Sequence, residues 1–261
     1  MVRSIVESPK YRAVSEDLIR QIGWRELAAR RSIKEAVKAT KNRLHQVAGA
    51  YLDSRPQYAA WTEQLEAAAQ SGDERELRAA CLQIMERHAS TRERIGILDS
   101  FYTTAQAGLP PVRSVLDVAC GLNPLAVPWM PLAADVAYYA CDIYADMMAF
   151  LNNFFRLIGV RGHAQVCDLI TASPRQPVDV ALVLKTLPPL EHLDKNAGLN
   201  LMRALNANYL LVSFPARSLG GRDKGMVEHY TSRFLKLTEA EGWPVARFEF
   251  ATELVFRVRK A

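Results

Sequence analysis

The 261-residue chain lacks the sequence features of several large protein classes. Its four cysteines form no Cys-x-x-Cys pair and have no histidine cluster at zinc spacing, which argues against a metal site. The first nine residues place an acid and a proline where the apolar part of a signal peptide would lie. The most apolar stretch, residues 124–151, is interrupted by Asp135, Asp142 and Asp146, so it is not a membrane span. We expect a soluble, metal-free, cytoplasmic protein.

Charge is unevenly distributed in an otherwise ordinary composition of 49% hydrophobic and 23% charged residues. Residues 1–55 hold twelve Lys or Arg against six acidic residues, whereas residues 101–212 hold seven against eight. Two interpretations fit the basic start of the chain. Its charges are either the solvated faces of helices or a footprint for the phosphate backbone of a nucleic acid.

The first hundred residues have the pattern of an all-helical region. Ser15 is a candidate N-cap, and the segments 32–35, 73–76 and 90–93 read as capping boxes, each followed by helically spaced apolar residues. The last of these is predicted to open one helix that runs through Phe101. The linker Gly108-Leu109-Pro110-Pro111 ends the region, so the pattern divides the chain into residues 1–107 and 108–261.

Beyond the linker, short apolar runs alternate with helix-length spacers. This alternation is typical of βαβ units and of a mainly parallel sheet covered by helices on both faces. A last region leaves no room for a crossover helix, so it is expected to pair antiparallel. The predicted strands are Val115–Ala119, Val136–Ile143, Ala164–Cys167, Val178–Leu184, Tyr209–Phe214 and a final region from Arg247 to Val258.

Three acidic residues mark the ends of the first three predicted strands, where a doubly wound sheet binds its ligand. The first strand carries Asp117 and runs into a turn with the single glycine Gly121, which argues against a dinucleotide site. Asp142 has the spacing to accept both hydroxyls of a ribose, although a helix N-cap is the alternative. Asp168 can accept from an adenine amino group while its apolar neighbour Leu169 covers the ring. Together they indicate S-adenosylmethionine.

Four longer strings carry a family resemblance, which extends from Tyr11 to Glu253. They begin at His88-Ala-Ser-Thr-Arg-Glu-Arg and continue with Leu116-Asp-Val-Ala-Cys-Gly-Leu-Asn-Pro-Leu, Lys185-Thr-Leu-Pro-Pro-Leu-Glu and Ser213-Phe-Pro-Ala-Arg-Ser-Leu-Gly-Gly-Arg-Asp-Lys-Gly-Met. The chain resembles the 16S rRNA (guanine-1405, N7) methyltransferases, which confer aminoglycoside resistance. Two departures are small: Ala216 replaces a Thr, and Leu193 stands where members often have Gln.

The resemblance implies a Rossmann-like class I methyltransferase sheet of α/β class, mostly parallel with the last strand antiparallel, behind an N-terminal all-helical extension. Residues 1–107 would be an rRNA-binding subdomain and residues 108–261 the S-adenosylmethionine-dependent domain. The expected partner is the 30S subunit with its 16S rRNA, and a monomer is expected.

The resemblance also assigns residues to the cofactor, with His88 to Arg94 at its methionine end. A helix N-terminus at Ser90 would favour the methionine carboxylate, and Arg94 could pair with it. The alternative is a capping box with a surface arginine, and Tyr51 would otherwise be a core residue. The predicted cofactor set is Tyr51, His88, Ala89, Ser90, Arg94, Asp117, Ala119, Gly121, Asp142, Ile143, Asp168, Leu169, Leu184 and Leu193.

A second set is implied to hold the RNA. Lys185 and Glu191 would position the flipped guanine, and Glu191 could accept from its N1–H and amino groups. A glycine-rich loop carrying cations could follow a phosphate backbone, or could simply be a solvated loop. The predicted RNA-binding residues are Lys185, Glu191, Arg217, Arg222, Lys224 and Met226.

The target atom determines the expected chemistry. Guanine N7 has a lone pair and no proton, so no general base is expected and catalysis should rest on base flipping and alignment. The chain also lacks the Asn/Asp-Pro-Pro-aromatic signature of exocyclic-amine methyltransferases. Three alternatives stay open at this point: methylation of a nearby adenine N1 or another RNA base, a non-catalytic RNA-binding protein, and a small-molecule methyltransferase.

Overall fold

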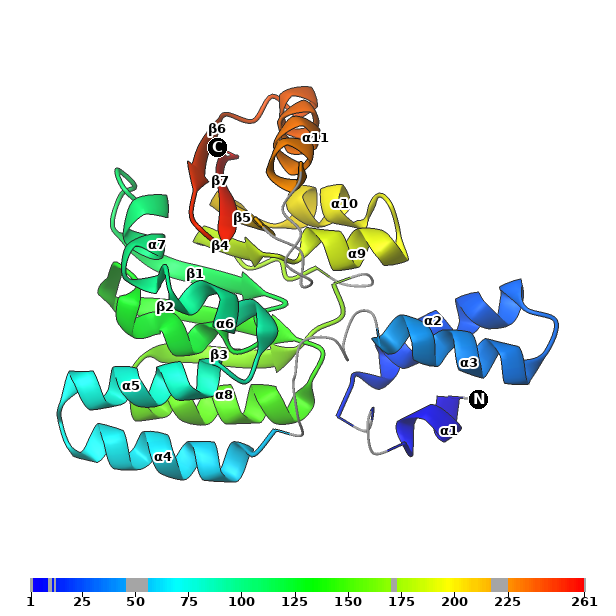
Figure 1. The fold of residues 1–261 in the computed structure, drawn as a ribbon, viewed down its shortest axis with the longest axis horizontal. Coiled ribbons are helices and arrows are strands. Elements are labelled where there is room, and N and C mark those ends of the chain that lie inside the picture. The colour runs from blue at the N-terminus through cyan, green and yellow to red at the C-terminus, as the bar shows by residue number, and fades with distance from the viewer. Residues whose placement is uncertain are drawn as a thin grey trace.

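A computed structural model describes residues 2–8, 11, 13–45, 56–169, 173–216 and 225–260 of the chain. Helices precede the sheet in sequence, as the apolar spacing predicts (Figure 1). They are α1 (Val2–Val6), α2 (Glu16–Ala29), α3 (Ile33–Leu44), α4 (Tyr58–Gln70), α5 (Glu74–Met85), α6 (Ala89–Ile95) and α7 (Leu98–Ala105).

The second half of the chain forms one seven-stranded sheet in the order β3-β2-β1-β4-β5-β7-β6. Strands β1 to β5 pair in parallel, and β7 pairs antiparallel with both β5 and β6. The strands are β1 (Val112–Val118), β2 (Leu132–Asp142), β3 (Arg161–Val166), β4 (Val178–Leu184), β5 (Ala207–Pro215), β6 (Val245–Glu249) and β7 (Glu253–Arg259). The remaining helices are the 3-10 helix η2 (Asn123–Trp129), α8 (Ala145–Leu157), α9 (Leu187–Leu193), α10 (Ala197–Ala204) and α11 (Met226–Ala240).

This topology confirms the predicted fold class. The near-continuous apolar run of β4 is buried on both faces, as a central parallel strand requires. Its single acid, Asp179, accepts hydrogen bonds from the backbone of Arg113 and Ser114 at an irregularity of β1. The last predicted strand region is a hairpin of two strands, because Phe250 to Thr252 turn the chain back on itself.

The predicted helix starts were partly right. The hydroxyls of Ser15 and Ser32 accept from backbone N–H groups three residues on, whereas Asp73 accepts from Arg75. The capping box at Ser90 is wrong, because α6 begins at Ala89 and the Thr91 hydroxyl closes the preceding turn on the carbonyls of Met85 and His88. The single helix expected to run through Phe101 is also wrong, since the chain leaves the helical path at Gly96–Ile97.

The seven described helices that precede β1 in the sequence pack in two ways. Helices α4, α5 and α7 contribute buried residues to the same core cluster as β1, β2 and α8. Helices α1 to α3 form a smaller cluster of their own, and lie beyond the carboxyl ends of the strands in Figure 1. Whether residues 1–107 and 108–261 are separate folding units stays a prediction. Within the described residues, no helix combines the length and apolarity needed to cross a membrane.

Candidate functional site

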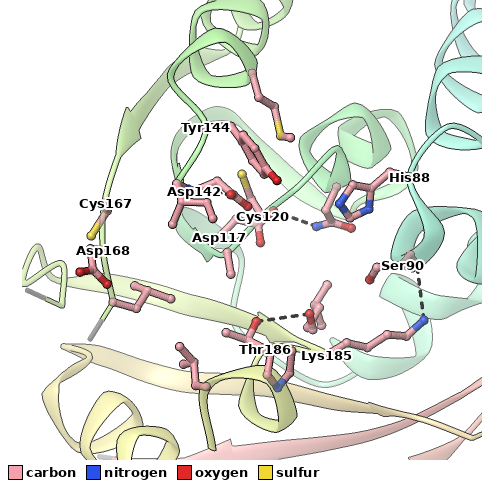
Figure 2. A pocket seen from close by; sticks show the side chains of 18 of the residues that line it. His88, Ser90, Asp117, Cys120, Asp142, Tyr144, Cys167, Asp168, Lys185 and Thr186 are labelled. Atoms are coloured by element: carbon pink, nitrogen blue, oxygen red, sulfur yellow. Dashed lines mark hydrogen bonds between the residues drawn. The ribbon is translucent and has the colours of Figure 1, made fainter. Parts of the chain in front are cut away.

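A pocket opens at the carboxyl ends of the first four strands, beside α6 and α9 (Figure 2). Leu18, at the start of α2, also lines it. Its lining joins segments from across the chain. The lining residues are Leu18, His88, Ser90, Arg94, Asp117, Ala119, Cys120, Asn123, Asp142, Ile143, Tyr144, Met147, Cys167, Asp168, Leu169, Leu184, Lys185, Thr186, Pro189, Leu190 and Leu193.

Most of the predicted cofactor residues lie in this lining. Ala89 and Gly121 do not line the pocket themselves but adjoin residues that do. Tyr51 lies outside the described residues. The structure adds residues that the sequence did not single out, among them Leu18, Asn123 and Tyr144. The role of each residue toward a cofactor stays a prediction.

Asp117 is buried at the end of β1 with its two carboxylate oxygens in different situations. Oδ2 accepts from Asn123 Nδ2 at 2.8 Å and from the Tyr138 hydroxyl at 2.9 Å. Oδ1 has no hydrogen-bond partner among the described residues. Burial raises the pKa of Asp117 to about 7, although the hydrogen bonds from Asn123 and Tyr138 and the charge of Arg94 act in the opposite direction. An unpartnered buried oxygen is costly unless a ligand supplies a donor.

The turn after β1 requires unusual backbone. Ala119 and Gly121 both have positive φ, 48° and 50°. Two features of Gly121 exclude a side chain there. Its φ is positive, and a Cβ would lie 2.7 Å from the His88 ring. Left-handed backbone at a residue with a side chain is uncommon and tends to occur at functional sites. The single glycine of this turn therefore allows close packing against the ring of His88, the residue that precedes α6.

Asp142 is held from two sides at the end of β2. Its Oδ2 accepts from Gly121 N at 2.9 Å and its Oδ1 from Ile143 N at 2.6 Å. Burial raises the pKa of Asp142, and these two backbone hydrogen bonds partly offset that effect. The alternative role as a helix N-cap is wrong, because Tyr144 precedes the first residue of α8. Each oxygen keeps acceptor capacity toward the pocket, since a carboxylate has about four acceptor sites.

Arg94 is fully buried, so the alternative of a surface arginine is wrong. Its guanidinium donates to Glu253 from Nε at 3.1 Å and from Nη2 at 2.8 Å, and to Asn123 Oδ1 from Nη1 at 2.6 Å. Burial alone would raise the pKa of Glu253, but the charges of Arg94 and Lys185 and hydrogen bonds from Arg94 and Ser213 hold it below its ordinary value. A paired, hydrogen-bonded carboxylate is the form in which a buried acid stays ionised.

Lys185 belongs to the same network at the end of β4. Its Nζ lies 2.6 Å from Glu93 Oε2 and 3.3 Å from Glu253 Oε2, and it donates to the Ser90 carbonyl at 3.3 Å. Its backbone is left-handed, with φ of 56°, and its N–H is anchored on Ser213. Two buried cations thus share Glu253 along one side of the pocket.

The predicted RNA-binding residues are dispersed. Glu191 does not line the pocket; its carboxylate lies 2.7 Å from Arg233 Nη2 and faces α10 and α11. Met226 is half-buried at the first position of α11. Arg217, Arg222 and Lys224 lie outside the described residues. Their contacts with RNA stay predictions.

Among the described residues, no group of three or more His, Cys, Asp or Glu side chains is placed to hold a metal ion. The pocket instead offers carboxylates at three strand ends, two ion-paired cations and apolar walls. This combination suits a polar, partly cationic organic ligand with a flat apolar part.

The sheet order, with an antiparallel β7 between β5 and β6, and the pocket at the strand ends define a class I methyltransferase. The sequence profile of the family described as ribosomal RNA methyltransferase (FmrO) matches residues 7–257. The chain belongs to this family.

Individual relatives agree with this membership. The chain is 42% identical to a 16S rRNA (guanine(1405)-N(7))-methyltransferase of Frankia casuarinae over 260 residues, which are 98% of this chain and 92% of the relative. A protein of the same name from Micromonospora echinospora is 37% identical, with 99% and 95% covered. The crystal structure of the 16S rRNA methyltransferase RmtF in complex with S-adenosyl-L-homocysteine superposes with a TM-score of 0.82 at 32% identity, covering 100% of this chain and 96% of that one.

Proposed function

We propose that this protein transfers the methyl group of S-adenosylmethionine to N7 of the guanine at position 1405 of 16S rRNA in the 30S subunit, and that it thereby confers aminoglycoside resistance. The observation that carries the proposal is the pocket at the ends of β1 to β4 in a chain of the FmrO family. We also propose that the protein acts as a monomer, because residues of a single chain form the described lining of the pocket. The 30S substrate implies action in the cytoplasm.

The residues of the pocket fit this cofactor. The unpartnered Oδ1 of Asp117 can accept a hydrogen bond from a ligand, and the methionine ammonium is a donor of the right charge. Asp142, fixed by two backbone donors, can accept both ribose hydroxyls. Asp168 and Leu169 follow β3 beside Asp142, where an adenine ring would extend. Bound there, the cofactor supplies an electrophilic methyl group on a sulfonium centre.

The chain's own residues then have a positioning role. Lys185 holds its ammonium between Glu93 and Glu253, and an ammonium has no lone pair with which to accept a proton. No proton must leave N7 either, so the reaction needs an oriented base more than a general base. Orientation of this kind can lower a barrier by roughly 7–11 kcal/mol. The pocket wall at Lys185, Pro189 and Leu190 is where the guanine would enter.

We also propose that α1–α3 docks on the rRNA. Most of the arginines on these helices are ion-paired, such as Arg20 with Glu16 and Arg30 with Glu26. Four exposed cations make no ion pair with any described residue: Arg25, Arg31, Lys34 and Lys38. Unpaired surface cations are the groups that can neutralise phosphates and release counterions.

The test is to locate the modified base. Purified enzyme and S-adenosylmethionine are incubated with unmethylated 30S subunits, and the 16S rRNA is treated with borohydride and aniline, which break the strand at N7-methylguanine. Primer extension should then end one nucleotide on the 3′ side of guanine 1405. A modification at an adenine, or on free nucleotides alone, would contradict the proposal.

A kinetic experiment tests the mechanism. With saturating cofactor, the single-turnover rate should be nearly flat between about pH 6.5 and 8.5, because neutral guanine needs no deprotonation. Glu191→Gln should lower the rate without changing this flat profile. A log-linear rise in the wild-type rate that the variant abolishes would make Glu191 a base and contradict the mechanism.

A further inference from the structure

The N-terminal helices are attached to the pocket wall by backbone pairing. Val14 forms an antiparallel bridge with Tyr144, flanked by hydrogen bonds from Ser15 N to Ile143 O at 2.8 Å and from Ala145 N to Ala13 O at 3.0 Å. Ile143 and Tyr144 directly follow Asp142 and line the pocket. The segment that leads into α2 is therefore paired, residue by residue, with one side of the predicted ribose site.

Leu18 extends this attachment into the pocket. It lies in the first turn of α2, where the Ser15 hydroxyl accepts from its backbone N–H. Its side chain is 3% exposed and lines the pocket, while it also belongs to the small core of α1–α3. Ile143 and Tyr144 pack against that same small core. One apolar cluster thus serves both the interior of α1–α3 and the wall of the pocket.

A second contact reaches the opposite side of the pocket. On α3, Arg43 donates from Nη1 to the backbone carbonyl of His192 at 2.9 Å. That carbonyl lies at the end of α9, whose residues Leu190 and Leu193 line the pocket. In Figure 1, α2 and α3 accordingly lie beside the open end of the sheet, near both α9 and the end of β2.

We propose that α1–α3 supplies part of the cofactor site through Leu18, and that cofactor binding and 30S docking are therefore coupled. A ligand that contacts Leu18, Ile143 and Tyr144 binds better when α1–α3 is seated. By linkage, docking of α1–α3 on the rRNA then strengthens cofactor binding by the same factor by which the cofactor strengthens docking. The second half of this inference rests on the proposed function; the first half concerns the pocket alone.

The first arm of the test needs no ribosome. Titration calorimetry measures the dissociation constant of S-adenosylhomocysteine for the full chain, for Leu18→Ala and for Ile22→Ala. Ile22 is the matched control, because it is 5% exposed in the same cluster one turn further along α2 but does not line the pocket. Leu18→Ala should weaken binding about tenfold, a loss equivalent to one or two buried methylene groups.

The control makes each outcome decisive. Ile22→Ala should keep the wild-type dissociation constant within about twofold, although it removes a comparable buried side chain. Equal weakening in both variants would assign the effect to looser packing of α1–α3 and would overturn the place of Leu18 in the pocket wall. An unchanged constant in Leu18→Ala would overturn it as well.

The second arm measures the affinity of the same three proteins for 30S subunits, with and without saturating S-adenosylhomocysteine. The wild type and Ile22→Ala should bind about fivefold or more tightly with the ligand, within the usual range of coupling between sites, and Leu18→Ala should lose most of this gain. An affinity of the wild type for 30S subunits that is the same with and without S-adenosylhomocysteine would overturn the coupling. Failure of the wild type to methylate 30S subunits would instead overturn the proposed function.

Discussion

Helices α1–α3 and α4–α7 are consecutive in the chain but relate to the sheet in opposite ways. The second group shares its buried residues with β1, β2 and α8, so it belongs to the methyltransferase core. The first group buries a smaller set of residues, mostly among themselves, and contacts the rest of the molecule through Ile143 and Tyr144, the β-bridge of Val14 and the Arg43 hydrogen bond. Elements with few shared buried contacts open at lower free energy. Helical content alone therefore does not distinguish the helices of the methyltransferase core from those proposed to dock on the rRNA; the buried residues shared with the sheet do.

The largest expected effect on stability comes from a substitution that breaks the ion-pair network between α6 and the sheet. Arg94→Ala leaves Glu253 as a buried charge without its bidentate partner, which should lower the free energy of unfolding by about 3–5 kcal/mol. Urea denaturation measures the loss. The matched control on the docking side is Arg3→Ala, whose ion pair with Glu7 is exposed and should contribute less than about 1 kcal/mol. Similar losses in both variants would erase the distinction between the two groups of helices.

The next effect concerns the pocket end of β1. Burial raises the pKa of Asp117 to about 7, above its value in the unfolded chain. The contribution of this carboxyl to stability is therefore complete below about pH 4 and is lost as the pH rises through 7. Asp117→Asn removes this loss, so without cofactor the variant should be roughly 2–4 kcal/mol more stable at pH 8, with no advantage at pH 4.

Asp117→Asn should weaken cofactor binding, although it raises the stability of the cofactor-free protein at high pH. The wild type should bind S-adenosylmethionine more weakly as the pH falls below 7, because the carboxyl becomes protonated, and the variant should bind weakly at every pH. Denaturation curves and calorimetry across pH provide both readings. Parallel stability profiles for the two proteins would show that Asp117 is ionised throughout and contradict this account.

A smaller effect is expected on the docking side, at Trp24. This indole on α2 is 66% exposed beside Arg25, and it can stack on an unpaired base. Trp24→Ala should weaken 30S binding by roughly 1–3 kcal/mol, while Trp24→Phe keeps most of the affinity. Neither the cofactor dissociation constant nor the unfolding midpoint should move. The control is Leu235→Ala, another exposed apolar residue but on α11. An equal effect of both substitutions on 30S binding would remove the special role of α2.

The smallest effect is a change in salt dependence. Replacing Lys34 and Lys38 with Gln should reduce the slope of log affinity against log salt by about 2, roughly one for each lost phosphate contact. Filter binding to 30S subunits at several salt concentrations measures this slope. Arg20→Gln serves as the control, because Arg20 is already paired with Glu16 and should change the slope less than either lysine. Identical slopes for all proteins would place the rRNA contact elsewhere.

Much of the fold could be predicted from the sequence because it follows local patterns. The apolar run of β4 has the predicted bounds, and the strand ends at Asp117, Asp142 and Asp168 meet in one pocket because parallel strands share an edge. Helix starts were less predictable. Ser90 and Thr91 are adjacent hydroxyl residues, and only their tertiary contacts select which one closes the turn.

The parts of the site that could not be predicted depend on contacts between distant segments. Arg94 and Glu253 are separated by 159 positions, and only the antiparallel insertion of β7 beside β5 brings them together. The only sequence signal for this contact was Glu253, a single acidic residue at the start of an apolar strand. Leu18 reads as an ordinary core residue of an amphipathic helix. Glu191 was predicted to position the guanine, but its carboxylate faces Arg233 instead. The sequence of a short helix does not reveal which of its side chains face the pocket.

The place of β7 has a consequence for how the protein is made. Synthesis is vectorial, and Arg94 emerges long before Glu253, yet Glu253 is the shared counter-ion of Arg94 and Lys185. A nascent chain that stops before β7 lacks the carboxylate that Arg94 and Lys185 share, so Lys185 keeps only Glu93 as a counter-ion, and the β5 edge that pairs with β7 has no partner. The pocket wall at Arg94 and Lys185 therefore has its full set of ion pairs only once the last strand of the sheet has been made.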